Sequence, residues 1–182
     1  MNKKLLSVVA AAFILAGCAS GVTRAPSASA ERVSAPAYSQ FASVSLSMSA
    51  EAKEKALDNL KFNQDELFSY IKRALDSRSL ISASRDNQLP RIEVVVKDMR
   101  VRSNFSAIMW GFMAGSDSIE GEIVLTDAAG KELDRFVVST SYALGGIAGG
   151  QDSTRMSWLY EKFAEETVRE LSKQQKPVVS QR

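Results

Sequence analysis

The residue with the clearest chemical role is Cys18, the only cysteine in a chain of 182 residues. It closes the sequence Leu15-Ala16-Gly17-Cys18, which follows two lysines and an apolar run within residues 3–16. A charged start, an apolar run and a small-residue cleavage region predict a secretory signal. The run is shorter than the roughly 20 residues that a membrane-spanning helix needs. We therefore expect residues 1–17 to be a cleaved signal and the mature chain to begin at Cys18.

The ending Leu15-Ala16-Gly17-Cys18 resembles the lipobox of bacterial lipoproteins. In that class the cysteine sulfur takes a diacylglycerol, the signal is cut before it, and the new amine often takes an acyl chain such as palmitate. Several acyl chains meet the requirement for stable membrane anchoring. Ala19 stands where inner-membrane lipoproteins commonly carry Asp, so the resemblance implies a periplasm-facing anchor in the outer membrane. The alternative is an ordinary cleaved signal followed by a chance cysteine.

The rest of the composition argues against an enzyme. The chain has no histidine, which removes a Ser-His-Asp triad, the commonest general base and the commonest metal ligand. A Ser–Lys dyad stays open, but no nucleophile sits in a recognisable elbow. Carboxylates recur at Asp117, Glu120 and Glu122, of which the last two share a strand face, where we expect them to be solvated. We expect no catalytic residue, no metal and no cofactor beyond the lipid on Cys18.

A glycine-rich loop at residues 145–150 precedes a predicted helix, where backbone amides could hold an anion. Gln151 stands where a phosphate-binding loop carries its lysine, so a plain turn and helix cap is favoured.

The net charge of +2 comes from the signal, because Lys3 and Lys4 leave with it and no acidic residue does. The mature chain then holds 21 basic and 21 acidic residues. A nucleic-acid partner, which requires a net basic face, is therefore not expected.

The mature chain divides into three parts. Residues 18–37 combine the lipidated cysteine with a segment rich in Ala, Ser, Pro and Gly, which cannot bury enough apolar surface to become ordered. We expect this segment to be a flexible tether. Residues 38–172 form a single periplasmic domain, and residues 173–182 form a polar tail.

Within the domain, alternating apolar residues predict strands at 38–48, 91–102, 119–126 and 136–142. Helical spacing predicts a weak helix at 49–60 and two stronger ones, from an Asn63 cap to Arg78 and from about 152 to 171. A slip in the apolar phase predicts a bulge near Lys97-Asp98, and Asp127 to Gly130 predict a hairpin turn. The expected fold is α+β: a small antiparallel sheet of about four strands, including a meander, with two main helices packed on one face.

Residues 91–171 also carry a family pattern. It comprises Ile-Glu-Val-Val-Val, Met-Ala-Gly at 113–115, Ile119-Glu-Gly-Glu-Ile, Asp127-Ala-Ala-Gly130-Lys-Glu-Leu and a closing amphipathic helix. This pattern resembles the bacterial lipoproteins that carry the domain of unknown function 4410. The resemblance spans roughly Tyr38 to Leu171 and transfers no catalytic residue. A more distant likeness is to auxiliary lipoproteins of envelope transport systems.

One connection between strands is unusually apolar, from Phe105 to Met113. Connections usually run over the surface, and aromatic and Met side chains are enriched in contacts between proteins. The residues expected to contact a partner or ligand are Phe105, Met109, Trp110, Phe112 and Met113. The alternative is a short helix that folds into the core. We expect a non-enzymatic lipoprotein that binds an unknown envelope protein as an accessory to transport or assembly; the alternative is a small domain that binds a lipid or another apolar ligand.

Overall fold

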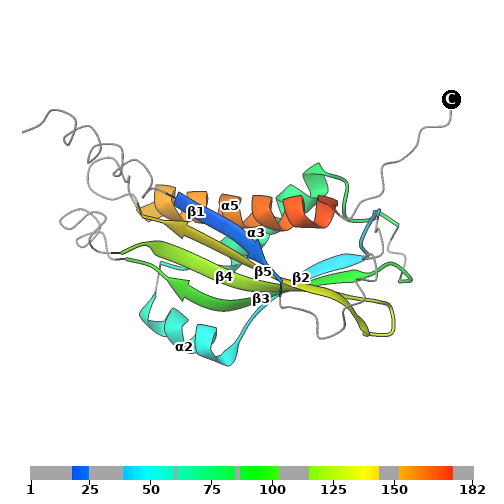
Figure 1. The fold of residues 1–182 in the computed structure, drawn as a ribbon, viewed down its shortest axis with the longest axis horizontal. Coiled ribbons are helices and arrows are strands. Elements are labelled where there is room, and N and C mark those ends of the chain that lie inside the picture. Colours follow the sequence, from blue (N-terminus) through cyan, green and yellow to red (C-terminus); the bar gives the residue numbers. More distant parts are fainter. Residues whose placement is uncertain are drawn as a thin grey trace, which may run out of the picture.

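The computed structural model describes residues 18–24, 39–59, 61–84, 87–102, 115–143 and 152–173. These residues form one five-stranded sheet in the order β1-β5-β4-β3-β2, with three helices (Figure 1). The strands are β1 (Cys18–Thr23), β2 (Ser43–Met48), β3 (Arg91–Arg100), β4 (Asp117–Thr126) and β5 (Glu132–Tyr142). The helices are α2 (Ala50–Asp58), α3 (Gln64–Ser77) and α5 (Asp152–Lys173). The predicted α+β class is confirmed.

The central strands β3, β4 and β5 form the predicted antiparallel meander. The register shifts between Val96 and Asp98, which confirms the predicted bulge. The extra residue lets both Val96 and Met99 point into the core, where each is buried. At the hairpin between β4 and β5, the Gly130 N–H donates to the Asp127 carbonyl oxygen at 3.1 Å, and Gly130 has a φ of +83° that suits glycine.

Two features of the sheet differ from the sequence prediction. β2 runs parallel to β3 rather than antiparallel, because α2 and α3 lie between them and carry the chain back to the same end. A fifth strand, β1, pairs antiparallel with β5 at the opposite edge. It lies where the tether was predicted, so residues 18–23 are a correction to that boundary. Their short side chains give little sequence signal, since this strand is held largely by its backbone pairing and a few side-chain bonds.

Helices α3 and α5 pack against each other and cover one face of the sheet, as predicted. α3 begins at the predicted cap, where the Asn63 side chain accepts from the Glu66 N–H at 3.0 Å. The core lies between the helices and the sheet, and at its centre the ring of Phe163 lies so close to Gly121 that an added Cβ would meet it at 2.6 Å. The weaker helix α2 begins after a Ser49 cap and contacts β3, away from α3 and α5 (Figure 1).

Candidate functional site

Cys18 is the first residue of β1, so the one cysteine of the chain is part of the sheet. It lies opposite Tyr142, the last residue of β5, and Tyr142 in turn lies opposite Asp117, the first residue of β4. Cys18 therefore marks one end of the sheet. Of the segment predicted as a tether, residues 18–23 form this strand and residues 25–38 lie outside the described residues.

Side chains on β1 and just after it fasten the strand to α5 and β5. The Ser20 hydroxyl donates to Glu166 Oε1 at 2.8 Å. The Arg24 guanidinium donates to Asp134 Oδ1 at 2.6 Å and to Glu170 Oε1 at 3.0 Å, and it lies 5.0 Å from the centre of the Phe136 ring. We call these four contacts the β1 latch. They compensate for the small apolar area that this strand offers.

The pKa values of the latch agree with this geometry. Burial alone would lower the pKa of the Arg24 guanidinium, but its hydrogen bonds to Asp134 and Glu170 outweigh burial and raise it. Burial alone would raise the pKa of Glu170, but its bonds to Lys173 and Arg24 outweigh burial and lower it. Both groups therefore stay charged at neutral pH, and the ion pair between Arg24 and Glu170 is kept.

The same end of the sheet holds a buried charged cluster of Arg102, Asp117 and Arg155, whose exposed fractions are 4%, 0% and 1%. Asp117 Oδ2 accepts from Arg102 Nη2 at 3.0 Å and from Arg155 Nε at 2.9 Å. Asp117 Oδ1 accepts from the Arg102 backbone N–H at 2.7 Å. The cluster therefore joins the end of β3, the start of β4 and the first turn of α5.

The two guanidinium groups of the cluster also bind backbone carbonyl oxygens. Arg102 donates to those of Gly115 at 2.8 Å and Tyr142 at 3.1 Å, and Arg155 donates to that of Arg102 at 3.1 Å. A carboxylate that already accepts three bonds is poorly placed to act as a base, so this arrangement positions chain segments rather than performing chemistry. The sequence reasoning missed the cluster. One available signal was the alternation of β4, which places Asp117 on the buried face with Ile119 rather than with Glu120.

The carboxylates on the open face of the sheet are engaged in ion pairs and hydrogen bonds. Glu122 lies 2.7 Å from Arg135 Nη1 and 3.8 Å from Lys97 Nζ, and Glu120 accepts from the Ser139 hydroxyl at 3.3 Å. This face was expected to be solvated, and Glu120 is exposed. A shallow groove of about 390 Å³ crosses it and is lined mainly by serines and other small residues of β1, β4 and β5.

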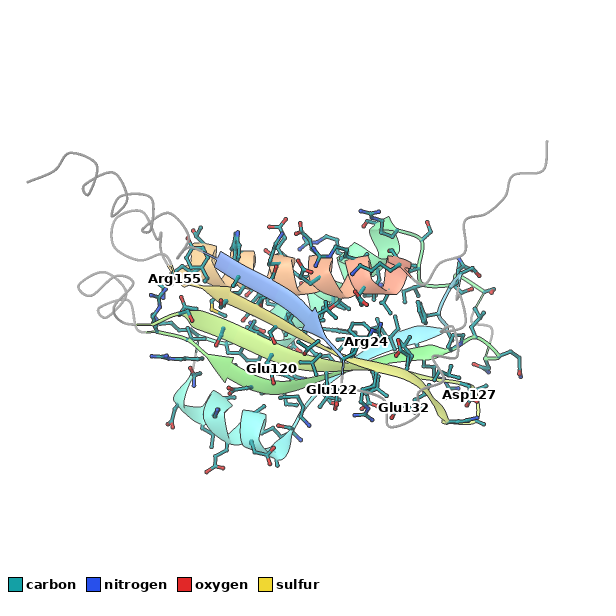
Figure 2. All side chains as sticks on the ribbon, viewed as in Figure 1. Arg24, Glu120, Glu122, Asp127, Glu132 and Arg155 are labelled. Atoms are coloured by element: carbon teal, nitrogen blue, oxygen red, sulfur yellow. The ribbon has the colours of Figure 1, made fainter. Side chains whose placement is uncertain are left out.

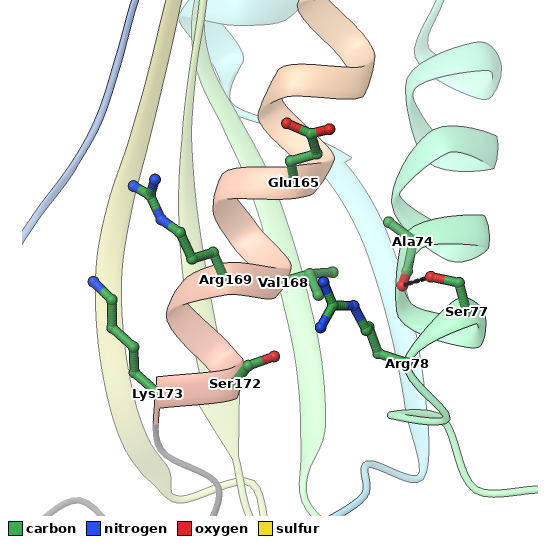
Figure 3. Close-up of a pocket in the computed structure, with 8 residues that line it drawn as sticks. All are labelled: Ala74, Ser77, Arg78, Glu165, Val168, Arg169, Ser172 and Lys173. Atoms are coloured by element: carbon green, nitrogen blue, oxygen red, sulfur yellow. Dashed lines mark hydrogen bonds between the residues drawn. The ribbon is translucent and has the colours of Figure 1, made fainter.

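A larger groove of about 620 Å³ lies between α3 and α5, at their carboxyl-terminal ends (Figure 3). Arg169 and Lys173 on its rim pair with Glu166 and Glu170, while Arg78 has no ion-pair partner among the described residues. The carboxyl-terminal ends of both helices meet here, and such ends carry partial negative charge. The basic side chains therefore offset the helix ends, and no set of groups converges on one point.

A family model decides the relationship of the chain to known proteins. The model describes a domain of unknown function (DUF4410) and matches residues 32–146, more than half of the chain. The chain belongs to the DUF4410 family. This confirms the family resemblance seen in the sequence, although the match ends before α5. β1 and α5, which the latch joins, both lie outside the residues that the DUF4410 model matches.

Two solved structures resemble the DUF4410 chain at low identity. A PelC dodecamer from Paraburkholderia phytofirmans is 13% identical, with 88% of this chain and 99% of that chain covered and a TM-score of 0.46. A minor lipoprotein from Acinetobacter baumannii is 14% identical, with 73% and 94% covered and a TM-score of 0.38. At these TM-scores no role follows for the DUF4410 domain. No curated protein matches the chain.

The predicted contact residues of the DUF4410 domain, Phe105, Met109, Trp110, Phe112 and Met113, lie outside the described residues. The described chain stops at Arg102 and resumes at Gly115, and these two residues are joined by a hydrogen bond. Arg102 and Gly115 therefore both lie at the Cys18 end of the sheet. The glycine-rich loop also lies outside the described residues. Of the helices that are described, none is long and apolar enough to cross a membrane.

Proposed function

We propose that this DUF4410 chain is a lipid-anchored lipoprotein of the outer membrane, with a non-enzymatic periplasmic domain that binds an envelope partner. The observation that carries the proposal is Cys18. It is the only cysteine, it closes a lipobox-like sequence, and it is the first residue of β1. Ala19, in place of Asp, favours the outer membrane. An accessory role in envelope transport or assembly fits a domain of this kind.

The absence of an enzymatic role is part of the proposal. With no histidine in the chain, catalysis would depend on carboxylates, lysines or hydroxyls. Asp117, the most deeply buried of the described carboxylates, accepts bonds from two arginines, and Glu122 is paired on the open face. These arrangements support a structural use of the charged groups. Turnover on a broad hydrolase panel that a single substitution abolishes would contradict this part of the proposal.

The partner contact is proposed to be the apolar segment, through Phe105, Met109, Trp110, Phe112 and Met113. Aromatic and Met side chains are enriched at protein interfaces. The segment leaves and rejoins the described chain at Arg102 and Gly115, close to the anchoring residue. A partner bound there would therefore be held near the membrane surface.

The anchor is tested by labelling cells with a fatty-acid probe. The wild-type protein should take the label and fractionate with membranes, and Cys18→Ser should do neither. A matched control, Cys18→Ser combined with Ser20→Cys, keeps one thiol but moves it away from Gly17, so it should also stay unlabelled. If Cys18→Ser still carries the label and stays in the membrane, the proposed anchor is wrong.

The partner contact is tested by photo-crosslinking in cells. A photoreactive residue replaces Trp110, and a control places it at Ser45, which is exposed on β2. A discrete protein adduct from position 110 alone is the expected result and would identify the partner. No adduct at either position, in a folded and membrane-bound protein, would contradict the contact. Stoichiometric lipid beyond the anchor, recovered by solvent extraction, would instead indicate a ligand-binding domain.

A further inference from the structure

We propose that the Cys18 end of the sheet is held directly against the bilayer, so that the domain stands on the membrane in one orientation with its strands pointing away. This inference rests on the proposed lipidation of Cys18 and specifies the geometry of the anchor. The surface that faces the lipid is the end where β1 and β4 begin and β3 and β5 end, and its occupant is the phospholipid bilayer.

Cys18 is connected to the folded domain without an intervening linker. The acyl chains of a lipoprotein are attached to the side chain and the amine of its first residue, and here that residue pairs with Tyr142 in the sheet. No residue lies between the lipid and the folded domain. A flexible tether of some 20 residues would place the domain roughly 25 Å from its anchor. With Cys18 inside β1, the separation is limited to one side chain and the lipid backbone.

The two ends of the sheet are well separated. Cys18, Tyr142 and Asp117 are in register at one end, and the hairpin from Asp127 to Gly130 lies at the other. Strands of ten residues span about 33 Å, so the hairpin is roughly that far from the anchor. Arg155 and Asp127 lie at opposite ends of the molecule in Figure 2.

β1 is attached to the domain at several points, which fixes the orientation of the domain as well as its distance from the membrane. All six of its residues pair with β5. Ser20 is held by Glu166, and Arg24, just beyond the strand, is held by Asp134 and Glu170. Because β1 is bonded to both β5 and α5, the domain cannot rotate freely about the lipidated residue.

The membrane-facing end is itself held together by buried charges. The Arg102, Asp117 and Arg155 cluster joins β3, β4 and α5 at the same end of the sheet as Cys18, with β5 between β4 and the anchored strand. These bonds hold the strand ends and α5 in a fixed arrangement next to the membrane. Arg102 and Ala143, at which two described stretches of the chain end, both lie at this end of the sheet.

The test uses the lone cysteine of the chain. Once Cys18 is lipidated, the mature protein has no other thiol, so a new cysteine gives a single labelling site. Ser141→Cys places a fluorophore on β5 beside the anchor, and Ala129→Cys places it on the exposed hairpin at the far end. Each lipidated protein is reconstituted into phosphatidylethanolamine and phosphatidylglycerol vesicles, with or without lipids that carry a nitroxide on the headgroup.

We expect the label at position 141 to lose most of its emission with the nitroxide lipids, and the label at position 129 to keep it. A control variant with 20 Gly and Ser residues inserted between Cys18 and Ala19 should remove most of the difference. Equal quenching of the two labels without the insertion, or stronger quenching at position 129, overturns the proposed orientation. The intact mass of each sample separates the two proposals, because a protein without lipid contradicts the anchor itself rather than its geometry.

Discussion

Replacing Asp117 with Asn removes one negative charge from a site that holds two buried arginines. Asp117 is fully buried, and its oxygens accept three hydrogen bonds from Arg102 and Arg155. An amide keeps the shape of the carboxylate but not its charge, and its NH₂ group faces donors instead of acceptors. Both guanidinium groups would then stay buried but lose the charged carboxylate that accepts a hydrogen bond from each of them.

The magnitude follows from the burial. Removing one partner of a buried ion pair costs about 3–5 kcal/mol, because the remaining charge stays desolvated and uncompensated. For a domain of this size, 1 kcal/mol shifts the melting temperature by about 3–4 °C. We therefore expect Asp117→Asn to lower the melting temperature by about 10 °C or more.

The assay is thermal unfolding of the detergent-solubilised protein, followed by circular dichroism. Glu120→Gln is the matched control, since Glu120 is an exposed carboxylate on the same strand, and its effect should stay within about 0.5 kcal/mol. A shift below about 1 kcal/mol for Asp117→Asn would refute the reasoning.

Three further predictions concern packing, the latch and a buried tyrosine. Gly121→Ala should destabilise the domain by about 1–3 kcal/mol in thermal unfolding, because an aromatic ring fills the space a methyl group needs, whereas Gly21→Ala, with open space, should be nearly neutral. Arg24→Ala should speed amide hydrogen exchange in residues 18–23, because Arg24 connects the end of β1 to two carboxylates. Arg135→Ala is the control: it also removes an arginine with two carboxylate partners, but Arg135 is on β5 and its partners hold no residue of β1, so this exchange should not change. Equal exchange rates in both variants would contradict the latch. Burial raises the pKa of Tyr160 to about 12, so stability should be complete below about pH 10 and fall as the pH rises from 10 to 12, because the unfolded state loses its proton first; Tyr160→Phe should lack this fall, and a wild-type curve flat over this range would contradict it.

Much of the fold follows from local patterns. The bulge at Val96 and Asp98, the hairpin at Gly130 and the cap at Asn63 were predictable because each depends on neighbouring residues. The parallel pairing of β2 with β3 was not, since alternation in one strand says nothing about the direction of its neighbour.

The candidate site was harder to predict, because its parts are distant in the sequence. Ser20 and Glu166 are 146 positions apart, and Arg155 and Asp117 are 38 apart. Val22 is the one large apolar residue of β1, so neither strand propensity nor an alternation of apolar residues distinguishes this segment from a tether. Cys18 was predictable as an anchor from its preceding residues, but its place inside the sheet depends on partners that only the fold brings together.

The most direct test of the central claim is the intact mass of the protein extracted from separated outer membranes. We expect a mature chain of residues 18–182 with a diacylglycerol and an N-acyl group, and fragmentation should place both on Cys18. An unmodified chain, or one that begins at another residue, would contradict the anchor and with it the orientation of the sheet on the membrane.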